Sequence, residues 1–139
     1  MKIELFLAAD YANITGDGKL NVMGIFREIN ALNFPARHSS MHLVIKLVAE
    51  LGEYGITRDL FVRLLDPDGK EIMSLSGQIN MPQGGGGRTP EVNVILELKD
   101  VIFPNPGPYQ FVVLVDKDHK GFLHIYVNKV ESPDLIQGK

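Results

Sequence analysis

Residues 91–127 decide the fold of this chain of 139 residues. They begin with Glu91-Val-Asn-Val-Ile-Leu-Glu-Leu-Lys99, turn through Phe103-Pro-Asn-Pro-Gly-Pro-Tyr109, and continue as Gln110-Phe-Val-Val-Leu-Val-Asp116. After Lys117-Asp-His-Lys120 the chain returns as Gly121-Phe-Leu-His-Ile-Tyr-Val127. Runs rich in Val, Ile and Phe between Pro, Gly and Asp are typical of strands joined by turns. This stretch therefore predicts three β-strands, the last two joined by a tight turn.

The rest of the chain continues this pattern. Apolar and polar residues alternate over residues 2–11 and 41–51, which indicates strands, and further strands are expected at 20–29, 56–65 and 71–79. Asp17-Gly18 and Asp66-Pro-Asp-Gly-Lys70 have the composition of hairpin turns. Residues 31–40 form an expected connection. The regular spacing predicts an all-β fold of about eight mostly antiparallel strands.

The corner at Pro106-Gly-Pro-Tyr109, followed by alternating apolar residues, indicates the type of all-β fold. It resembles the corner that enters a late strand in immunoglobulin-like and fibronectin-type sandwiches. There a Tyr at the start of the strand returns its hydroxyl to the backbone. We therefore expect an immunoglobulin-like β-sandwich that forms a single domain over residues 1–130, followed by a loosely ordered tail over residues 131–139.

The composition excludes several classes of protein. The formal net charge is −3 and Lys and Arg are not clustered, so we expect no nucleic-acid partner. The chain has no cysteine, which excludes disulfides and a cysteine nucleophile. No apolar run approaches the ~20 residues of a membrane span, and Glu4 interrupts the short apolar run that a signal peptide would need. We therefore expect a cytoplasmic protein with no membrane contact.

No motif predicts a catalytic or metal site. The four histidines are His38, His42, His119 and His124. They are scattered over a junction, a turn and a strand face, so surface histidines explain them better than a zinc site. The Gly84–Gly87 run precedes a strand rather than a helix, which favours a mobile loop over a phosphate-binding loop. Because no serine sits in a nucleophile elbow, we expect no cofactor, no metal and no enzymatic activity.

One sheet face is predicted to be apolar where solvent should lie. We expect strands 41–51, 109–116 and 121–130 to share a sheet, as their counterparts do in immunoglobulin-like sandwiches. The outer face of that sheet would carry Val44, Val48, Val112, Leu114, Phe122, His124 and Tyr126. A solvated face is mostly polar, so a contiguous apolar patch indicates an interface, with a homodimer as the simplest assembly. The other possibility is that the tail or residues 31–40 cover this face.

Several segments resemble a known family. Leu7-Ala-Ala-Asp-Tyr-Ala12, followed by Gly18-Lys-Leu-Asn-Val-Met-Gly-Ile-Phe26, resembles the opening of a bacterial and phage family known as a domain of unknown function. Phe34-Pro35, Asp66-Pro-Asp-Gly69 and Pro106-Gly-Pro-Tyr109 are similar to it in order and spacing. The resemblance implies one compact domain in a bacterial, cytoplasmic setting. It implies no activity, cofactor or catalytic residue.

We therefore predict a non-enzymatic interaction or structural module that self-associates, or binds an unidentified protein partner, through the apolar face. The alternative is a small-ligand or carbohydrate-binding sandwich, with its site formed by end loops that include Gly84–Gly87 and the Lys117–Lys120 turn. Exposed aromatic residues beside such loops would favour this alternative, and Tyr54 and Tyr126 are the candidates. An enzyme would need His119 or His124 beside a carboxylate in a deep cleft.

Overall fold

The computed structural model describes residues 1–135, which form nine strands in two sheets. Sheet A has the order β2-β1-β4-β7 and sheet B the order β3-β9-β8-β5-β6. The strands of sheet A are β1 (Lys2–Ile14), β2 (Leu20–Phe26), β4 (Ala36–Val48) and β7 (Glu91–Phe103). Those of sheet B are β3 (Glu28–Ala31), β5 (Thr57–Leu65), β6 (Glu71–Asn80), β8 (Gly107–Val115) and β9 (Asp118–Lys129). A single 3₁₀ turn, η1 (Pro133–Leu135), follows β9.

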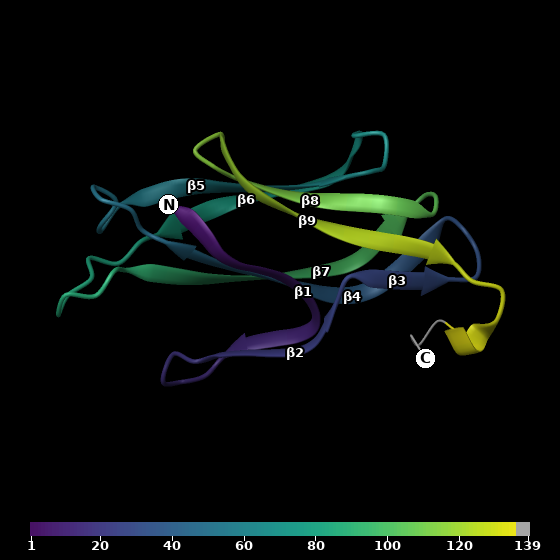
Figure 1. Ribbon diagram of the computed structural model, residues 1–139, viewed down its shortest axis with the longest axis horizontal. Coiled ribbons are helices and arrows are strands. Elements are labelled where there is room, and N and C mark those ends of the chain that lie inside the picture. Colours follow the sequence, from purple (N-terminus) through teal and green to yellow (C-terminus); the bar gives the residue numbers. More distant parts are fainter. Residues whose placement is uncertain (136–139) are drawn as a thin grey trace.

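The two sheets lie as two layers, with β5, β6, β8 and β9 in one and β1, β4 and β7 in the other (Figure 1). Named strand pairs are antiparallel except for β3, which runs parallel to β9. The prediction of an all-β fold is confirmed.

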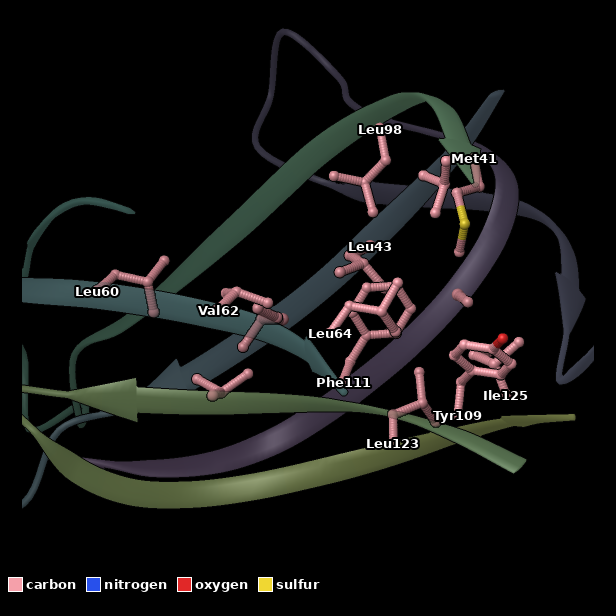
Figure 2. Close-up of a cluster of buried hydrophobic side chains, with 14 of the residues drawn as sticks. Met41, Leu43, Leu60, Val62, Leu64, Leu98, Tyr109, Phe111, Leu123 and Ile125 are labelled. Carbon is pink, nitrogen blue, oxygen red and sulfur yellow. The ribbon is translucent and has the colours of Figure 1, made fainter. Parts of the chain in front are cut away.

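The core lies between the layers and is built from one face of each strand. Because successive side chains of a strand point to opposite faces, Met41 and Leu43 of β4 point from sheet A toward Val62 and Leu64 of β5 in sheet B (Figure 2). Phe111 of β8 joins the same cluster. Fully burying a side chain of this kind contributes about 1.5–3 kcal/mol. This layer of apolar contacts holds the two sheets together.

Tyr109 closes the corner between β7 and β8 as the sequence predicted. Its hydroxyl donates a hydrogen bond to the Asn105 carbonyl oxygen at 2.7 Å and accepts one from the Asn105 N–H at 3.2 Å. The ring is buried and meets Phe103 edge to face, with centroids 4.9 Å apart. The prediction that this hydroxyl returns to the backbone is confirmed.

Two predicted segments differ from the structure. Residues 20–29, expected as one strand, are β2 in sheet A and β3 in sheet B, because the chain crosses between the layers at Arg27. Residues 31–40, expected as a connection, include the first part of β4. There Ala36 pairs with Phe103, and Arg37 binds Asp100 at 2.8 Å. The polar side chains of this part misled the prediction: Arg37, Ser39 and Ser40 are exposed, although this part of β4 pairs with the core residues Val101 and Phe103 of β7.

The expected partners of β4 were also wrong. β4 pairs with β1 on one side and β7 on the other, so both of its edges are occupied within sheet A. It therefore shares no sheet with β8 and β9. The turn between β8 and β9 lies at Asp116-Lys117, earlier than the predicted Lys117–Lys120, because Val115 pairs with Asp118. Of the predicted tail, residues 136–139 lie outside the described residues.

Candidate functional site

The outer face of sheet B brings together five of the predicted interface residues. Val112 pairs with Phe122, and the pairings of Gln110 with His124 and Pro108 with Tyr126 follow along the same two strands. Partners in an antiparallel pair project to the same face, so these residues and Leu114 share one surface. Val112 is 6% exposed and Phe122 is 54% exposed. The surface thus has a buried floor along β8 and a raised aromatic side along β9.

The aromatic side is a continuous row of rings, which we call the ring row: His119, Phe122, His124 and Tyr126. The rings of Phe122 and His124 meet edge to face at 5.2 Å, and those of His124 and Tyr126 stack at 6.0 Å. His119 lies 6.5 Å from Phe122 at the other end. The Arg27 guanidinium carbon sits 5.7 Å from the Tyr126 ring centre, and Arg27 Nε donates to the His124 carbonyl oxygen at 3.3 Å. These contacts fix the rings in one arrangement.

Beside the ring row, sheet B carries a hollow of about 940 Å³. Phe61 and Leu114 are paired across β5 and β8 and form its apolar floor. Gln78, Arg63 and Lys117 are among its polar lining residues. The turns that join β5 to β6 and β8 to β9 rise above this layer at its two ends (Figure 1). We call this feature the sheet B hollow.

The charges around the sheet B hollow are largely neutralised within the protein. Arg63 Nε lies 2.8 Å from Glu71 Oε1, and Arg58 Nε lies 3.1 Å from Asp116 Oδ2. The second oxygen of Asp116 accepts the Asp59 N–H at 2.9 Å. An ion pair between two partly exposed side chains adds little stability, about 0–1 kcal/mol, but it holds both side chains in place. The hollow therefore offers oriented polar groups around an apolar floor.

The other two predicted interface residues, Val44 and Val48, lie on the outer face of sheet A. Val44 pairs with Leu7 on one side and Ile95 on the other, and it is 0% exposed beneath its neighbours. The next row runs from Ile25 through Ala9 to His42. The most exposed apolar side chains of this face were not predicted. They are Tyr11, Met23 and Ile25.

These residues and Phe61 had a signal in the sequence. Met23 and Ile25 are separated by one residue, and Phe61 falls between the inward-facing Leu60 and Val62. A period of two places Met23 and Ile25 on one face of their strand, and Phe61 on the face opposite to that of Leu60 and Val62. The sequence does not give the strand order, and only the strand order shows that these residues lie next to the other exposed apolar residues.

The histidines stand apart from one another. His42 is buried on the outer side of sheet A, with Nδ1 3.2 Å from the Asp10 carbonyl oxygen and Nε2 3.8 Å from Glu97 Oε2. Burial lowers the pKa of His38 below its ordinary value, although the Asp10 carboxylate and the Ser40 backbone oppose this shift. Within residues 1–135, no group of three or more His, Asp or Glu side chains is placed to hold a metal ion.

The Gly84–Gly87 loop is not part of the sheet B hollow. Gly85 and Arg88 close this loop on itself through an isolated bridge, and the residues that line the hollow come from β5, β6, β8 and the β8–β9 turn. Of the two predicted loops, the structure therefore places only the Asp116–Lys117 end of the β8–β9 turn at the hollow. No helix in the described part of the chain is long and apolar enough to cross a membrane.

The fold and these surfaces define an all-β protein of two packed sheets with exposed apolar side chains on both outer faces. A family described as "Family of unknown function (DUF6941)" matches residues 4–128, and the chain belongs to this family. The resemblance found in the sequence is confirmed to this extent. No curated protein matches the chain.

Among solved structures, one similar chain is Pseudomonas fluorescens alkylpurine DNA glycosylase AlkC bound to DNA containing an abasic site analog. The identity is 11% and the TM-score 0.49, over 91% of this chain and 30% of that chain. The present chain thus spans less than a third of that protein. A TM-score this low supports no inference about the present fold or function.

Proposed function

We propose that the protein is a non-enzymatic interaction module that forms a homodimer through the outer face of sheet A. The observation that carries this proposal is the exposure of Tyr11, Met23 and Ile25, with Met23 62% and Ile25 58% exposed, beside the half-buried Leu7 and Ile95. Contiguous exposed apolar side chains on a sheet mark interaction surfaces. The proposed interface is thus an apolar sheet face, as the sequence predicted, but it lies on sheet A and not on the sheet that contains β8 and β9.

The charges of this face favour a second copy of the chain as the partner. Lys46 lies 3.4 Å from Glu91 and Lys99 lies 3.2 Å from Glu97, so each of these four charges has an opposite charge beside it on the same protomer. A two-fold dimer places the same patch on both sides of the interface. A patch with one sign of charge would repel itself in that arrangement, whereas neutralised pairs around an apolar centre do not.

The experiment is the oligomeric state measured by sedimentation equilibrium and light scattering over a range of concentrations. We expect a dimer for the wild type and a folded monomer for Ile25→Asp, because a carboxylate buried at the centre of the interface would be unpaired. Leu51→Asp is the matched control, since Leu51 is 96% exposed in a turn. It should remain dimeric.

Two outcomes would overturn the proposal. One is a wild-type protein that stays monomeric at the highest concentration reached. The other is dissociation by Phe122→Asp while Ile25→Asp remains dimeric, which would assign the interface to sheet B. Val44→Asp is unsuitable for this test because Val44 is fully buried, and an unpaired charge there would unfold the chain.

We also propose that the fold is immunoglobulin-like, with an added strand. The order β9-β8-β5-β6 corresponds to strands G-F-C-C′ of a variable-type domain. The Tyr109 corner stands where that fold has its tyrosine corner, before the strand that matches F. The added element is β1, which lies between β2 and β4 in sheet A. Its hairpin with β2 projects beyond the two layers (Figure 1).

A further inference from the structure

The outer face of sheet B has a chemistry of its own, because it places a row of rings beside a hollow lined by polar groups. We propose that the hollow and the ring row together form a binding site for a neutral carbohydrate chain. The site is on the opposite layer from the proposed dimer face and is independent of it.

The outer face of sheet B supplies exposed aromatic ring faces. Phe122 is 54% exposed and Phe61 is 37% exposed, so each offers part of its ring to a ligand. The face of a pyranose that carries its C–H bonds is apolar and packs against an aromatic ring, while its hydroxyls point outward. Phe122 is held by His119 on one side and His124 on the other. A ring that is already fixed loses little conformational entropy when a ligand packs on it.

The polar groups around the floor of the hollow are of the kinds that sugar recognition needs. A sugar hydroxyl is both a donor and an acceptor, so its recognition needs both kinds of partner within one site. The Gln78 side chain supplies both, Arg63 supplies N–H donors, and Asp59 supplies acceptor oxygens. Arg63 is oriented by Glu71 at 2.8 Å before any ligand arrives. This pattern of an apolar floor with a few placed polar groups is typical of small-molecule sites.

The charge of the site favours a neutral ligand. The lining of the hollow includes the carboxylates of Asp59, Glu71 and Asp116, against the cations of Arg63 and Lys117. Sites for single-stranded nucleic acid also use aromatic stacking, but they follow the phosphates with a positively charged groove. Here Arg63 is paired with Glu71 and Arg58 with Asp116, so these cations are already neutralised within the protein. The site therefore presents no positively charged groove to a polyanion.

The extent of the site favours a chain of sugar units. Across the outer face, Phe61 of β5 pairs with Leu114 of β8, which pairs with His119 of β9. β5 and β9 are therefore two strand spacings apart, about 10 Å. The volume of about 940 Å³ lies near the upper end of the range for small-molecule pockets, about 300–1,000 Å³. The span suits a chain of several sugar units better than a single sugar.

The test is isothermal titration calorimetry of the full chain with cellohexaose, maltohexaose, chitohexaose, xylohexaose and mannohexaose. Oligothymidylate and an oligogalacturonate serve as anionic probes. We expect at least one neutral hexasaccharide to bind, and amide chemical-shift changes to fall on β5, β8 and β9. Phe122→Ala and Phe61→Ala should each weaken binding about tenfold. Tyr54→Ala removes an exposed aromatic residue that does not line the hollow, and it should bind as the wild type does.

Phe122→Leu separates ring stacking from simple apolar contact, since it keeps most of the side-chain volume without the ring. It should lose affinity as Phe122→Ala does, and it provides a second variant if the alanine variant does not fold. The proposal is overturned if none of the neutral probes binds at millimolar concentration, if only the anionic probes bind, or if folded Phe122→Leu binds like the wild type. The oligomeric state of these variants should not change, so failure here is distinguishable from failure of the dimer.

Discussion

Asp116 and Asp59 join the β8–β9 turn to the start of β5 by two hydrogen bonds in opposite directions. The Asp116 N–H donates to the Asp59 carbonyl oxygen, and the Asp59 N–H donates to Asp116 Oδ1, both at 2.9 Å. Asp116 and Lys117 have φ of 48° and 73°, a left-handed conformation that favours glycine. The hydrogen bond that the Asp116 side chain accepts explains why an aspartate occupies position 116. Nothing comparable holds Lys117.

Lys117→Gly should therefore stabilise the protein. A residue with a Cβ in the left-handed region costs roughly 1–2 kcal/mol, and glycine offsets part of this gain through its larger unfolded-state entropy, so we expect about 0.5–1 kcal/mol. Urea denaturation measures it. Lys70→Gly, in the β5–β6 turn, is the control because its φ is not in this region, and it should be neutral or destabilising. A destabilised Lys117→Gly would contradict the strain at this turn.

Tyr109→Phe should destabilise the protein by about 1–2 kcal/mol, because it removes a hydroxyl that satisfies both backbone groups of Asn105. The matched control is Tyr126→Phe on the exposed ring row, with an expected change within about 0.5 kcal/mol. The measurement is the free energy of unfolding in urea at neutral pH. Equal effects at the two tyrosines would mean that the corner adds nothing to stability.

The Tyr109 corner could be predicted because its signal is local: the prolines, the glycine and the tyrosine lie within a few residues. The strand order could not be, because it depends on pairings between distant segments. β4 has buried apolar residues on both faces, Leu43 pointing inward and Val44 outward, so the pattern of β4 does not indicate which sheet it joins. The sequence also does not indicate that the chain crosses between the sheets at Arg27, because residues 20–29 have the pattern of one continuous strand.

His38 gives stability a dependence on pH. Burial lowers its pKa in the folded state below the unfolded value of about 6.5, so the folded state disfavours the protonated form. The contribution of this histidine is complete above the unfolded pKa and is lost as pH falls through the lower, folded-state pKa. Stability should therefore decrease as pH falls below about 6.5. The measurement is the thermal midpoint as a function of pH.

His38→Phe should reduce this loss of stability at low pH. His38 Nε2 is buried and has no hydrogen-bond partner, and its ring lies 5.7 Å from Phe26, so an apolar ring suits the site. We expect the variant to be at least as stable as the wild type at pH 7.5 and to gain relative to it as pH falls. His119→Phe, with its ring on the outer face of sheet B, is the control. If the thermal midpoints of the wild type and His38→Phe changed in parallel with pH, His38 would not be the cause of the loss of stability at low pH.

The two proposed surfaces should be separable because they lie on opposite layers. Ile25 belongs to the outer face of sheet A and Phe122 to that of sheet B. Ile25→Asp should therefore give a monomer that binds the hexasaccharide with wild-type affinity. Phe122→Ala should give a dimer with about tenfold weaker binding. Calorimetry and sedimentation on the same samples measure both properties, and the double variant should show both losses independently. If Ile25→Asp also abolished binding while the protein remained folded, the carbohydrate site would require two copies of the chain, and the surfaces would not be independent.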